Sequence, residues 1–366
     1  MKKILFVSTI HRMSERMLPA IIDYNTRHGE VTILNLGQSS ANTLYKENIR
    51  YLTCLKNVAN DIVIYNGKGI QNKRDVRNQV YCFESIKLID EICVSKNIDA
   101  IVLDDSRASH LNLLLGEYCN KVGIKLFANT HGNNDVHEWN EVNCLSNPFY
   151  YKLFVFGQYE VKHHEKKYAN QKYIAGGIPE NDVIKIAKKV PQQITVIVNR
   201  VVVDGPSTER LFDFSVFQQM KLQELQKNLN LPIVFKIKDR MSEDTDRDIN
   251  ALKASIPKDI DYSIVVQLKN EVDFLAKSKI ILTHGSTMAF KALQLNIPTI
   301  IFKETGPVGL FSTYRGTISL EEDYFEILQY LTHDYIESFL PDILEGSTTF
   351  DATQRYSDAL SKEFIL

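Results

Sequence analysis

A short polar stretch in the second half of the chain carries residue types that bind phosphate. His284, Gly285, Ser286 and Thr287 follow an apolar run and precede a segment with helical spacing. Backbone N–H groups at a helix start lack partners within the helix, and the helix dipole is positive there, so this turn could bind an anionic group. Serine and threonine also begin helices as ordinary N-caps. The stretch therefore predicts either a phosphate site or a plainly capped helix.

Other polar side chains of the second half follow neighbouring apolar runs. Lys236 and Lys238 alternate along one run, so both side chains point to the same side of a strand and could reach phosphates. A solvated strand edge accounts for the same two lysines equally well. Asn199 and Arg200 end the preceding run. They are therefore expected at the same end of the strands as the two lysines, at the mouth of a ligand cleft. Glu271 opens a short helix, from which it could contact a base or a ribose.

The first half offers candidates for acid–base chemistry. His131 follows an apolar run beside a glycine, where an imidazole could remove the proton of a bound hydroxyl group. Asp104 and Asp105 follow another run, and one of them could serve as the base or hold the acceptor. His11 follows the first run and is a further candidate at the cleft edge. The structural alternatives are a histidine that caps a turn and two aspartates at a solvated helix start.

The first half alternates short apolar runs with longer helical patterns. The runs predict strands at residues 4–7, 30–34, 61–65, 99–103, 125–128 and 152–156. Apolar residues at helical spacing predict helices over residues 80–92 and 111–122. Strands that are apolar on both faces and separated by helices indicate a parallel sheet covered on both sides.

The same pattern restarts after residue 190. It predicts strands at residues 193–198, 231–237, 263–266, 279–283 and 298–302, and helices at 215–228, 271–276, 286–295 and 349–364. We expect an α/β protein of two Rossmann-like domains, residues 1–190 and 191–348, that face each other across a cleft. Residues 349–366 form a last helix that packs back on the first domain. Such sheets bind ligands at the carboxyl ends of their strands.

Composition excludes several classes of function. The 366 residues include 43 Lys and Arg against 45 Asp and Glu, a net charge of −2 that gives no general attraction to nucleic acid. No apolar run approaches the roughly 18 residues of a membrane span, and the start is too short for a signal peptide. The five cysteines lack a CxxC pair and fit reduced thiols in a cytoplasmic protein; they are Cys54, Cys82, Cys93, Cys119 and Cys144. No metal-binding, Walker or dinucleotide motif occurs, so we expect no metal and no cofactor.

The segment from Leu282 to Phe302 resembles the donor-site element of GT-B glycosyltransferases, in which a Gly-Ser/Thr turn starts a helix. The resemblance implies that this turn holds the nucleotide diphosphate or another anionic group of the donor. Many members place a glutamate about one turn into this helix. Here the corresponding residues are Ala289, Phe290 and Lys291, so the resemblance allows a UDP-, CMP- or CDP-linked donor.

A second resemblance covers the end of the first domain. The order of a His131-Gly132 loop, a strand at residues 152–156 and a Gly-x-Pro-x-x-Asp motif that ends at Asp182 is similar to CDP-glycerol glycerophosphotransferases and capsule-type transferases. The UDP-N-acetylglucosamine 2-epimerases share a looser version. Together the two resemblances span residues 126–302. They imply a GT-B fold with the acceptor on the first domain, near His11 and Asp182, and the donor on the second.

The resulting expectation is a glycosyltransferase of surface-polysaccharide or capsule synthesis. It moves a sugar from a nucleotide-activated donor to a glycan or lipid-linked acceptor, with inversion and without a metal. The alternatives are a UDP-sugar 2-epimerase or hydrolase, a glycerol- or ribitol-phosphate transferase, and a non-catalytic nucleotide-sugar-binding protein. The basic run Lys162–Lys167 predicts either a plain exposed helix or peripheral contact of a cytoplasmic protein with the inner face of the cell membrane.

Overall fold

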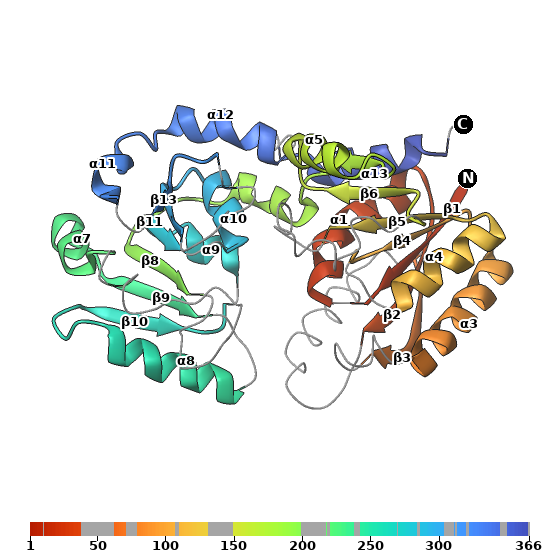
Figure 1. Cartoon of the computed structure of the whole chain (residues 1–366), viewed down its shortest axis with the longest axis horizontal. Helices are drawn as coiled ribbons and strands as arrows, with labels where there is room; N and C mark the ends of the chain where they lie inside the picture. Colours follow the sequence, from red (N-terminus) through yellow and green to blue (C-terminus); the bar gives the residue numbers. More distant parts are fainter. Residues whose placement is uncertain are drawn as a thin grey trace. The chain divides into compact units, whose positions relative to one another are not determined.

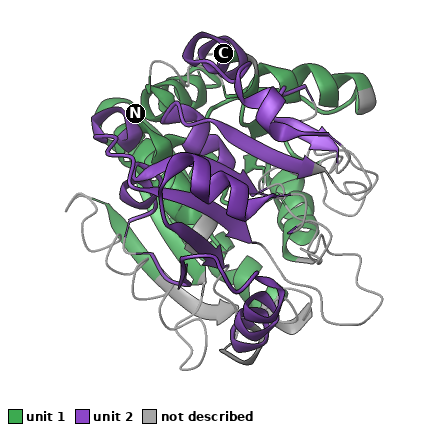
Figure 2. Cartoon of the chain, turned by 90° about the vertical axis from the view of Figure 1, so that its left-hand side faces the viewer, with its two compact units in different colours: residues 1–182, 341–366 green, residues 183–340 purple. Residues whose placement is uncertain are grey.

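The computed structural model forms two compact units. It describes residues 1–9, 11–37, 62–70, 79–106, 110–130, 149–198, 217, 220–237, 242–268, 270–283, 286–303, 311, 313–319, 322–344 and 350–364. Unit 1 comprises Met1–Asp182 and Pro341–Leu366, and unit 2 comprises Val183–Leu340 (Figure 2). The chain passes from unit 1 to unit 2 before residue 190. The backbone N–H of Val190 already donates a hydrogen bond to the Ala276 carbonyl of unit 2.

Unit 1 is built on a parallel sheet. Within the described residues this sheet has seven strands in the order β3-β2-β1-β4-β5-β6-β7 (Figure 1). The strands are β1 (Lys2–Ser8), β2 (Gly29–Gly37), β3 (Val63–Ile70), β4 (Ala100–Leu103), β5 (Lys125–Asn129), β6 (Lys152–Val155) and β7 (Tyr173–Ala175). The helices are α1 (His11–Arg27), α3 (Gln79–Lys96), α4 (His110–Val122), α5 (Gln158–Lys167) and α13 (Ala352–Lys362).

The unit 1 sheet is buried on both faces because its central strands carry consecutive apolar residues, such as Ile4–Val7 of β1 and Ala100–Leu103 of β4. Alternate residues point to opposite faces of a strand, so Leu5 and Val7 of β1 join one core cluster while Ile4 and Phe6 join the other. Helices α3 and α4 cover the first cluster, and α1 and α13 cover the second (Figure 1). Three buried free cysteines, Cys82, Cys93 and Cys119, pack in the first cluster, whereas Cys54 and Cys144 lie outside the described residues.

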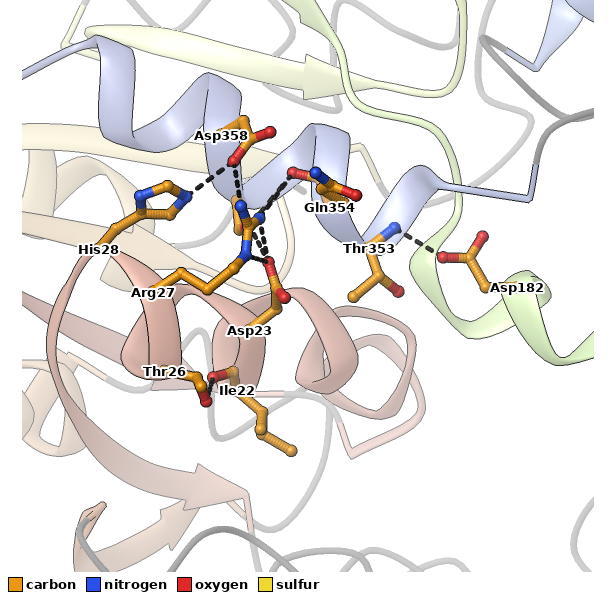
Figure 3. Close-up of polar contacts among 10 residues, drawn as sticks. Ile22, Asp23, Thr26, Arg27, His28, Asp182, Thr353, Gln354 and Asp358 are labelled. Carbon is orange, nitrogen blue, oxygen red and sulfur yellow. Dashed lines mark hydrogen bonds and ion pairs between the residues drawn. The ribbon is translucent and has the colours of Figure 1, made fainter.

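Charged side chains tie α13 to the end of α1 (Figure 3). Arg27 Nη1 lies 2.7 Å from Asp358 Oδ1, and His28 Nε2 lies 2.8 Å from the same oxygen. Arg27 also pairs with Asp23 one turn earlier in α1, and the Ser357 hydroxyl bonds to that carboxylate. The last helix of the chain therefore lies on unit 1, on the face that α1 also covers.

Unit 2 repeats the architecture. Its parallel sheet has six strands within the described residues, in the order β10-β9-β8-β11-β12-β13. They are β8 (Gln193–Val198), β9 (Ile233–Ile237), β10 (Tyr262–Val265), β11 (Ser278–Thr283), β12 (Thr299–Lys303) and β13 (Thr317–Ser319). The α-helices are α7 (Leu222–Leu229), α8 (Ser242–Ser255), α9 (Glu271–Leu275), α10 (Met288–Gln294), α11 (Tyr324–Leu328) and α12 (His333–Ile343), and α12 carries the chain back to unit 1.

Both sheets reverse their strand order beside the first strand. In unit 1, β1 pairs with β2 on one side and with β4 on the other. In unit 2, β8 pairs with β9 on one side and with β11 on the other. In open α/β sheets, the loops that leave the two adjacent strands at such a reversal run to opposite faces of the sheet. The crevice between these two loops is the usual ligand position. The prediction of an α/β fold with two Rossmann-like domains is confirmed. A cleft between the domains stays a prediction.

Candidate functional site

The reversal point of the unit 2 sheet lies between the carboxyl ends of β8 and β11. Thr283 ends β11, faces Ile197 of β8 in the strand register, and donates its hydroxyl hydrogen to the Ile197 carbonyl at 3.3 Å. Ser286 and Thr287 follow this end of β11 after an interval of two residues. The structure therefore places these two predicted donor-site residues at the crevice position. Four further candidates lie outside the described residues: Asn199, Arg200, His284 and Gly285.

Ser286 has a local structural task. Helix α10 begins at Met288, later than the predicted start at Ser286, and the Ser286 Oγ accepts a hydrogen bond from the Met288 backbone N–H at 3.3 Å. Thr287 makes no such capping bond with its side chain. The capping interpretation of the sequence thus has a bond to support it. Phosphate binding by the same turn stays a prediction.

An ion pair joins the helices that flank β11. Lys291 Nζ of α10 lies 2.6 Å from Glu271 Oε2 of α9, and the side chains are only 10% and 18% exposed. Asn270 caps α9 by accepting from the backbone N–H groups of Val272 and Asp273, which fixes Glu271 in the first turn. Lys291 is the lysine where the resemblance expects a glutamate. The carboxylate that lies next to Lys291 belongs to Glu271 of α9.

The ammonium group of Lys236 binds two carbonyl oxygens at the carboxyl edge of the unit 2 sheet. Its Nζ donates to Ile237 O at 2.6 Å and to Val266 O at 2.9 Å, which joins the ends of β9 and β10. Lys236 therefore lies at the predicted edge of the sheet and stabilises that edge. Lys238, its predicted companion, lies outside the described residues.

At the reversal point of unit 1, Asp104 holds the turn after β1. The side chain is fully buried, and its carboxylate accepts from Thr9 N at 2.8 Å, Thr9 Oγ1 at 2.6 Å and Ser14 Oγ at 2.6 Å. Its own backbone N–H donates to Val7 O at 3.1 Å. Because three donors from the turn after β1 and from α1 converge on this one side chain, the network fixes the start of α1 relative to β4. These contacts give Asp104 a positioning role.

Asp105 follows in a rigid turn. Its carbonyl oxygen accepts from Asn112 Nδ2 at 3.1 Å, and the next backbone N–H, that of Ser106, donates to Asn129 O at 2.8 Å. The Asp105 side chain is buried, at the carboxyl edge of the sheet. Two further predicted candidates are the histidines. His131 lies outside the described residues. His11 is the first residue of α1, and its side chain is not described.

Asn129 connects this edge with α13. Its Nδ2 donates to Leu103 O at 2.9 Å, and its Oδ1 accepts from the Tyr356 hydroxyl at 2.7 Å. The Tyr356 ring is fully buried and stacks on Phe154 with 4.0 Å between the ring centroids. Burial raises the pKa of Tyr356, and the hydrogen bond to Asn129 opposes that rise only in part. Sequence reasoning missed this pair, for which the only signal was an aromatic residue in the last helical pattern.

Asp182 binds the start of α13 (Figure 3). Its carboxylate oxygens accept from Ala352 N at 3.1 Å and from Thr353 N at 2.8 Å. Backbone N–H groups in the first turn of a helix need such acceptors. The residue that the resemblance assigned to acceptor binding therefore acts as a helix-terminus ligand in this structure.

The described residues contain neither a cluster of metal ligands nor a candidate membrane span. Across the described ranges, no three His, Cys, Asp or Glu side chains gather as ligands of a metal ion. In the same part of the chain, no helix combines the length and hydrophobicity of a membrane span.

Comparison with known proteins gives a match at the level of the fold. No protein-family model and no curated protein sequence matches the chain. UDP-GlcNAc 2-epimerase from Neisseria meningitidis, solved with bound UDP-GlcNAc, is 14% identical with a TM-score of 0.63 over 98% of this chain and 100% of the other. S. aureus MnaA, solved with UDP, is 13% identical with a TM-score of 0.66 over 99% and 97%.

A glycosyltransferase from Rickettsia africae has the same overall fold, with 13% identity and a TM-score of 0.57 over 99% of this chain and 98% of the other. Each of these matches runs over nearly the full length of both proteins. The resemblance to GT-B proteins that the sequence indicated is confirmed, and the chain has the GT-B fold of two Rossmann-like domains.

Proposed function

We propose that this chain is a nucleotide-sugar enzyme, and specifically a glycosyltransferase that transfers a sugar to a glycan or lipid-linked acceptor in surface-polysaccharide synthesis. The observation that carries the proposal is the position of Ser286 and Thr287 at the reversal point of the unit 2 sheet, where α/β sheets bind nucleotides. Proteins of the same fold have been solved with UDP or UDP-GlcNAc bound, which supports a nucleotide sugar as the ligand.

In the proposed reaction, unit 2 binds the donor and unit 1 binds the acceptor. The acceptor oxygen forms a bond to the anomeric carbon while the bond from that carbon to the phosphate oxygen breaks. A base takes the acceptor proton; the candidates are Asp105, at the carboxyl edge of the unit 1 sheet, and His131, which the sequence alone suggests. The departing phosphate gains charge, which hydroxyl and backbone donors of the Ser286 turn stabilise. Direct displacement of this kind inverts the anomeric centre.

A thermal-shift series tests the donor site. UDP, CMP, CDP and GDP are compared, because a ligand at about 100 times its Kd stabilises the folded protein by about 2.7 kcal/mol. We expect one nucleotide to raise the Tm, and Ser286→Ala to reduce that rise. Ser255→Ala serves as the control. It removes a hydroxyl group at the end of α8, which donates to Ala251 O at 2.9 Å within the same helix. If none of the four nucleotides shifts the Tm, the proposal is wrong.

Turnover tests the rest of the mechanism. His131→Ala should keep the nucleotide shift and slow transfer, while Lys238→Ala should weaken the nucleotide shift. NMR of the product gives its anomeric configuration, and retention would exclude direct displacement. Tight nucleotide binding with neither transfer nor hydrolysis would indicate a binding protein. Transfer to an added acceptor from CDP-glycerol, but from no nucleotide sugar, would indicate a glycerophosphate transferase.

A UDP-sugar 2-epimerase is the second candidate. UDP-GlcNAc 2-epimerases match this chain with TM-scores from 0.58 to 0.66, against 0.57 for the glycosyltransferase from Rickettsia africae. An epimerase needs no acceptor. Incubation with UDP-GlcNAc alone therefore separates the two functions: a new C2 epimer in the NMR spectrum supports the epimerase, and an unchanged donor that reacts only after an acceptor is added supports the transferase.

A further inference from the structure

The segment from Val183 to Val190, at the start of unit 2, exposes aliphatic side chains to solvent. Ile186 is 80% exposed, Val183 54% and Val190 43%. Isolated exposed aliphatic residues are common on protein surfaces, but three within eight positions form a cluster. The segment also contains Lys185, Lys188 and Lys189, all exposed, and no acidic residue.

The backbone holds these side chains outward. Residues Pro179–Ile186 form a 3₁₀-helix, in which side chains three positions apart lie on the same face. Val183 and Ile186 are such a pair, while Ile184 between them is buried. Beyond this helix the Val190 backbone N–H donates to Ala276 O at 3.0 Å, which anchors the segment to unit 2. The aliphatic face is therefore set by regular structure and not by a loose terminus.

From this surface, defined by Val183, Lys185, Ile186, Lys188, Lys189 and Val190, we propose that the protein binds an anionic phospholipid bilayer. Aliphatic side chains enter the boundary between headgroups and acyl chains, and neighbouring lysines interact with negative headgroups. Protein–protein interfaces, in contrast, are enriched in aromatic residues, Met and Arg and depleted in Lys. The composition of the surface thus favours lipid over an acidic protein.

The structure also distinguishes this surface from the basic run on α5. Lys162 and Lys166 of that helix are exposed, but Val161 is buried, and Glu165 is exposed among the lysines. Helix α5 therefore presents charge without an aliphatic side chain that could enter the bilayer. The segment 183–190 presents both. This proposal does not depend on the proposed function, because binding to lipid requires neither donor nor acceptor.

Vesicle sedimentation with the full chain tests the proposal. The protein is mixed with vesicles of phosphatidylcholine alone or of phosphatidylcholine with phosphatidylglycerol. We expect binding to the anionic vesicles, reduced by salt, and weak binding to the neutral ones. Lys188→Glu with Lys189→Glu should lower the partition coefficient at least about tenfold, since each lysine near an anionic surface contributes about 1 kcal/mol. Ile186→Ser should lower it with no change of charge.

Matched variants serve as controls. Val94→Ser removes an exposed aliphatic side chain from α3, and Lys162→Glu with Lys166→Glu reverses charge on α5. Both should bind like the unmodified protein. Failure of the unmodified chain to bind anionic vesicles, or loss of binding in the α5 variant but not in Ile186→Ser, would overturn the proposal. So would retention on polyglutamate beads combined with no binding to vesicles. An unchanged nucleotide-induced Tm shift in Ile186→Ser keeps this result separate from the donor site.

Discussion

The hydroxyl group of Tyr356 donates a hydrogen bond of 2.7 Å to Oδ1 of Asn129, a residue 227 positions earlier in the chain. Asn129 in turn donates to Leu103 O and accepts from Ser106 N, on either side of the two aspartates that follow β4. The last helix of the protein therefore supports the carboxyl edge of the unit 1 sheet, where the proposed acceptor chemistry lies.

Tyr356→Phe removes only this hydroxyl and keeps the ring that stacks on Phe154. The variant leaves the buried Asn129 Oδ1 without its partner, so we expect a loss of about 1–3 kcal/mol in the free energy of unfolding. Denaturant titration measures the loss. Tyr330→Phe, at an exposed tyrosine, is the control and should change stability little. Equal stability of the two variants would show that the hydrogen bond contributes nothing.

Asp104→Asn tests the positioning role of the buried carboxylate. The amide oxygen can keep the bonds that Oδ2 accepts from Thr9 N and Ser14 Oγ, but the amide N–H group then replaces the oxygen that accepts from the Thr9 hydroxyl, which costs about 1–3 kcal/mol. We expect lower stability together with slower turnover. Asp105→Asn, at the next position, should slow turnover with a smaller loss of stability if Asp105 is the base. Loss of turnover in Asp104→Asn at unchanged stability would instead favour a direct chemical role for Asp104.

The ion pair between Glu271 and Lys291 is largely buried, so removing one partner should be costly. Glu271→Ala leaves the ammonium group without this carboxylate, and we expect a loss of about 3 kcal/mol or more. Combining Glu271→Lys with Lys291→Glu should recover a part of the stability that each single exchange loses. A double-mutant cycle measured by denaturation gives the coupling energy. A coupling energy near zero would mean that the pair is not formed in solution.

The contact between α1 and α13 should weaken in acid. Burial alone would raise the pKa values of Asp23 and Asp358. Hydrogen bonds and nearby positive charge outweigh this effect and lower both pKa values below the usual 3.8; Arg27 contributes most for Asp23, and His28 followed by Arg27 for Asp358. A lowered pKa contributes stability above the unfolded-state value, and that contribution is lost as the pH falls through the folded-state value.

Hydrogen exchange of the α13 amides over the acid range measures this dependence. Protection should be constant above about pH 5 and should fall below about pH 4. Asp358→Asn removes one of the two titrating groups, and its protection should be lower at neutral pH and fall less steeply in acid. An identical acid profile in the variant would contradict the assignment to this cluster, which also includes His28 at 2.8 Å from Asp358.

The amino-acid sequence by itself determined the α/β class and the two-fold repetition of the fold. Apolar runs such as Ile4–Val7 and Val196–Val198 lie in β1 and β8 because a strand buried on both faces is rich in apolar residues along its length. Order along the chain also placed Asp104 and Ser286 near the carboxyl ends of strands, since Asp104 follows β4 directly and Ser286 follows β11 after two residues.

The tertiary structure alone decided what these side chains do. Asp104 became a positioning residue through Thr9 and Ser14, which lie 95 and 90 positions away, and Asp182 binds the start of a helix 170 positions later. Short elements such as β7, with three residues, carry no periodic signal of their own and form only because a neighbouring strand pairs with them. Hydrogen-bond partners follow from which strands and helices meet in space, and local sequence patterns contain no record of those meetings.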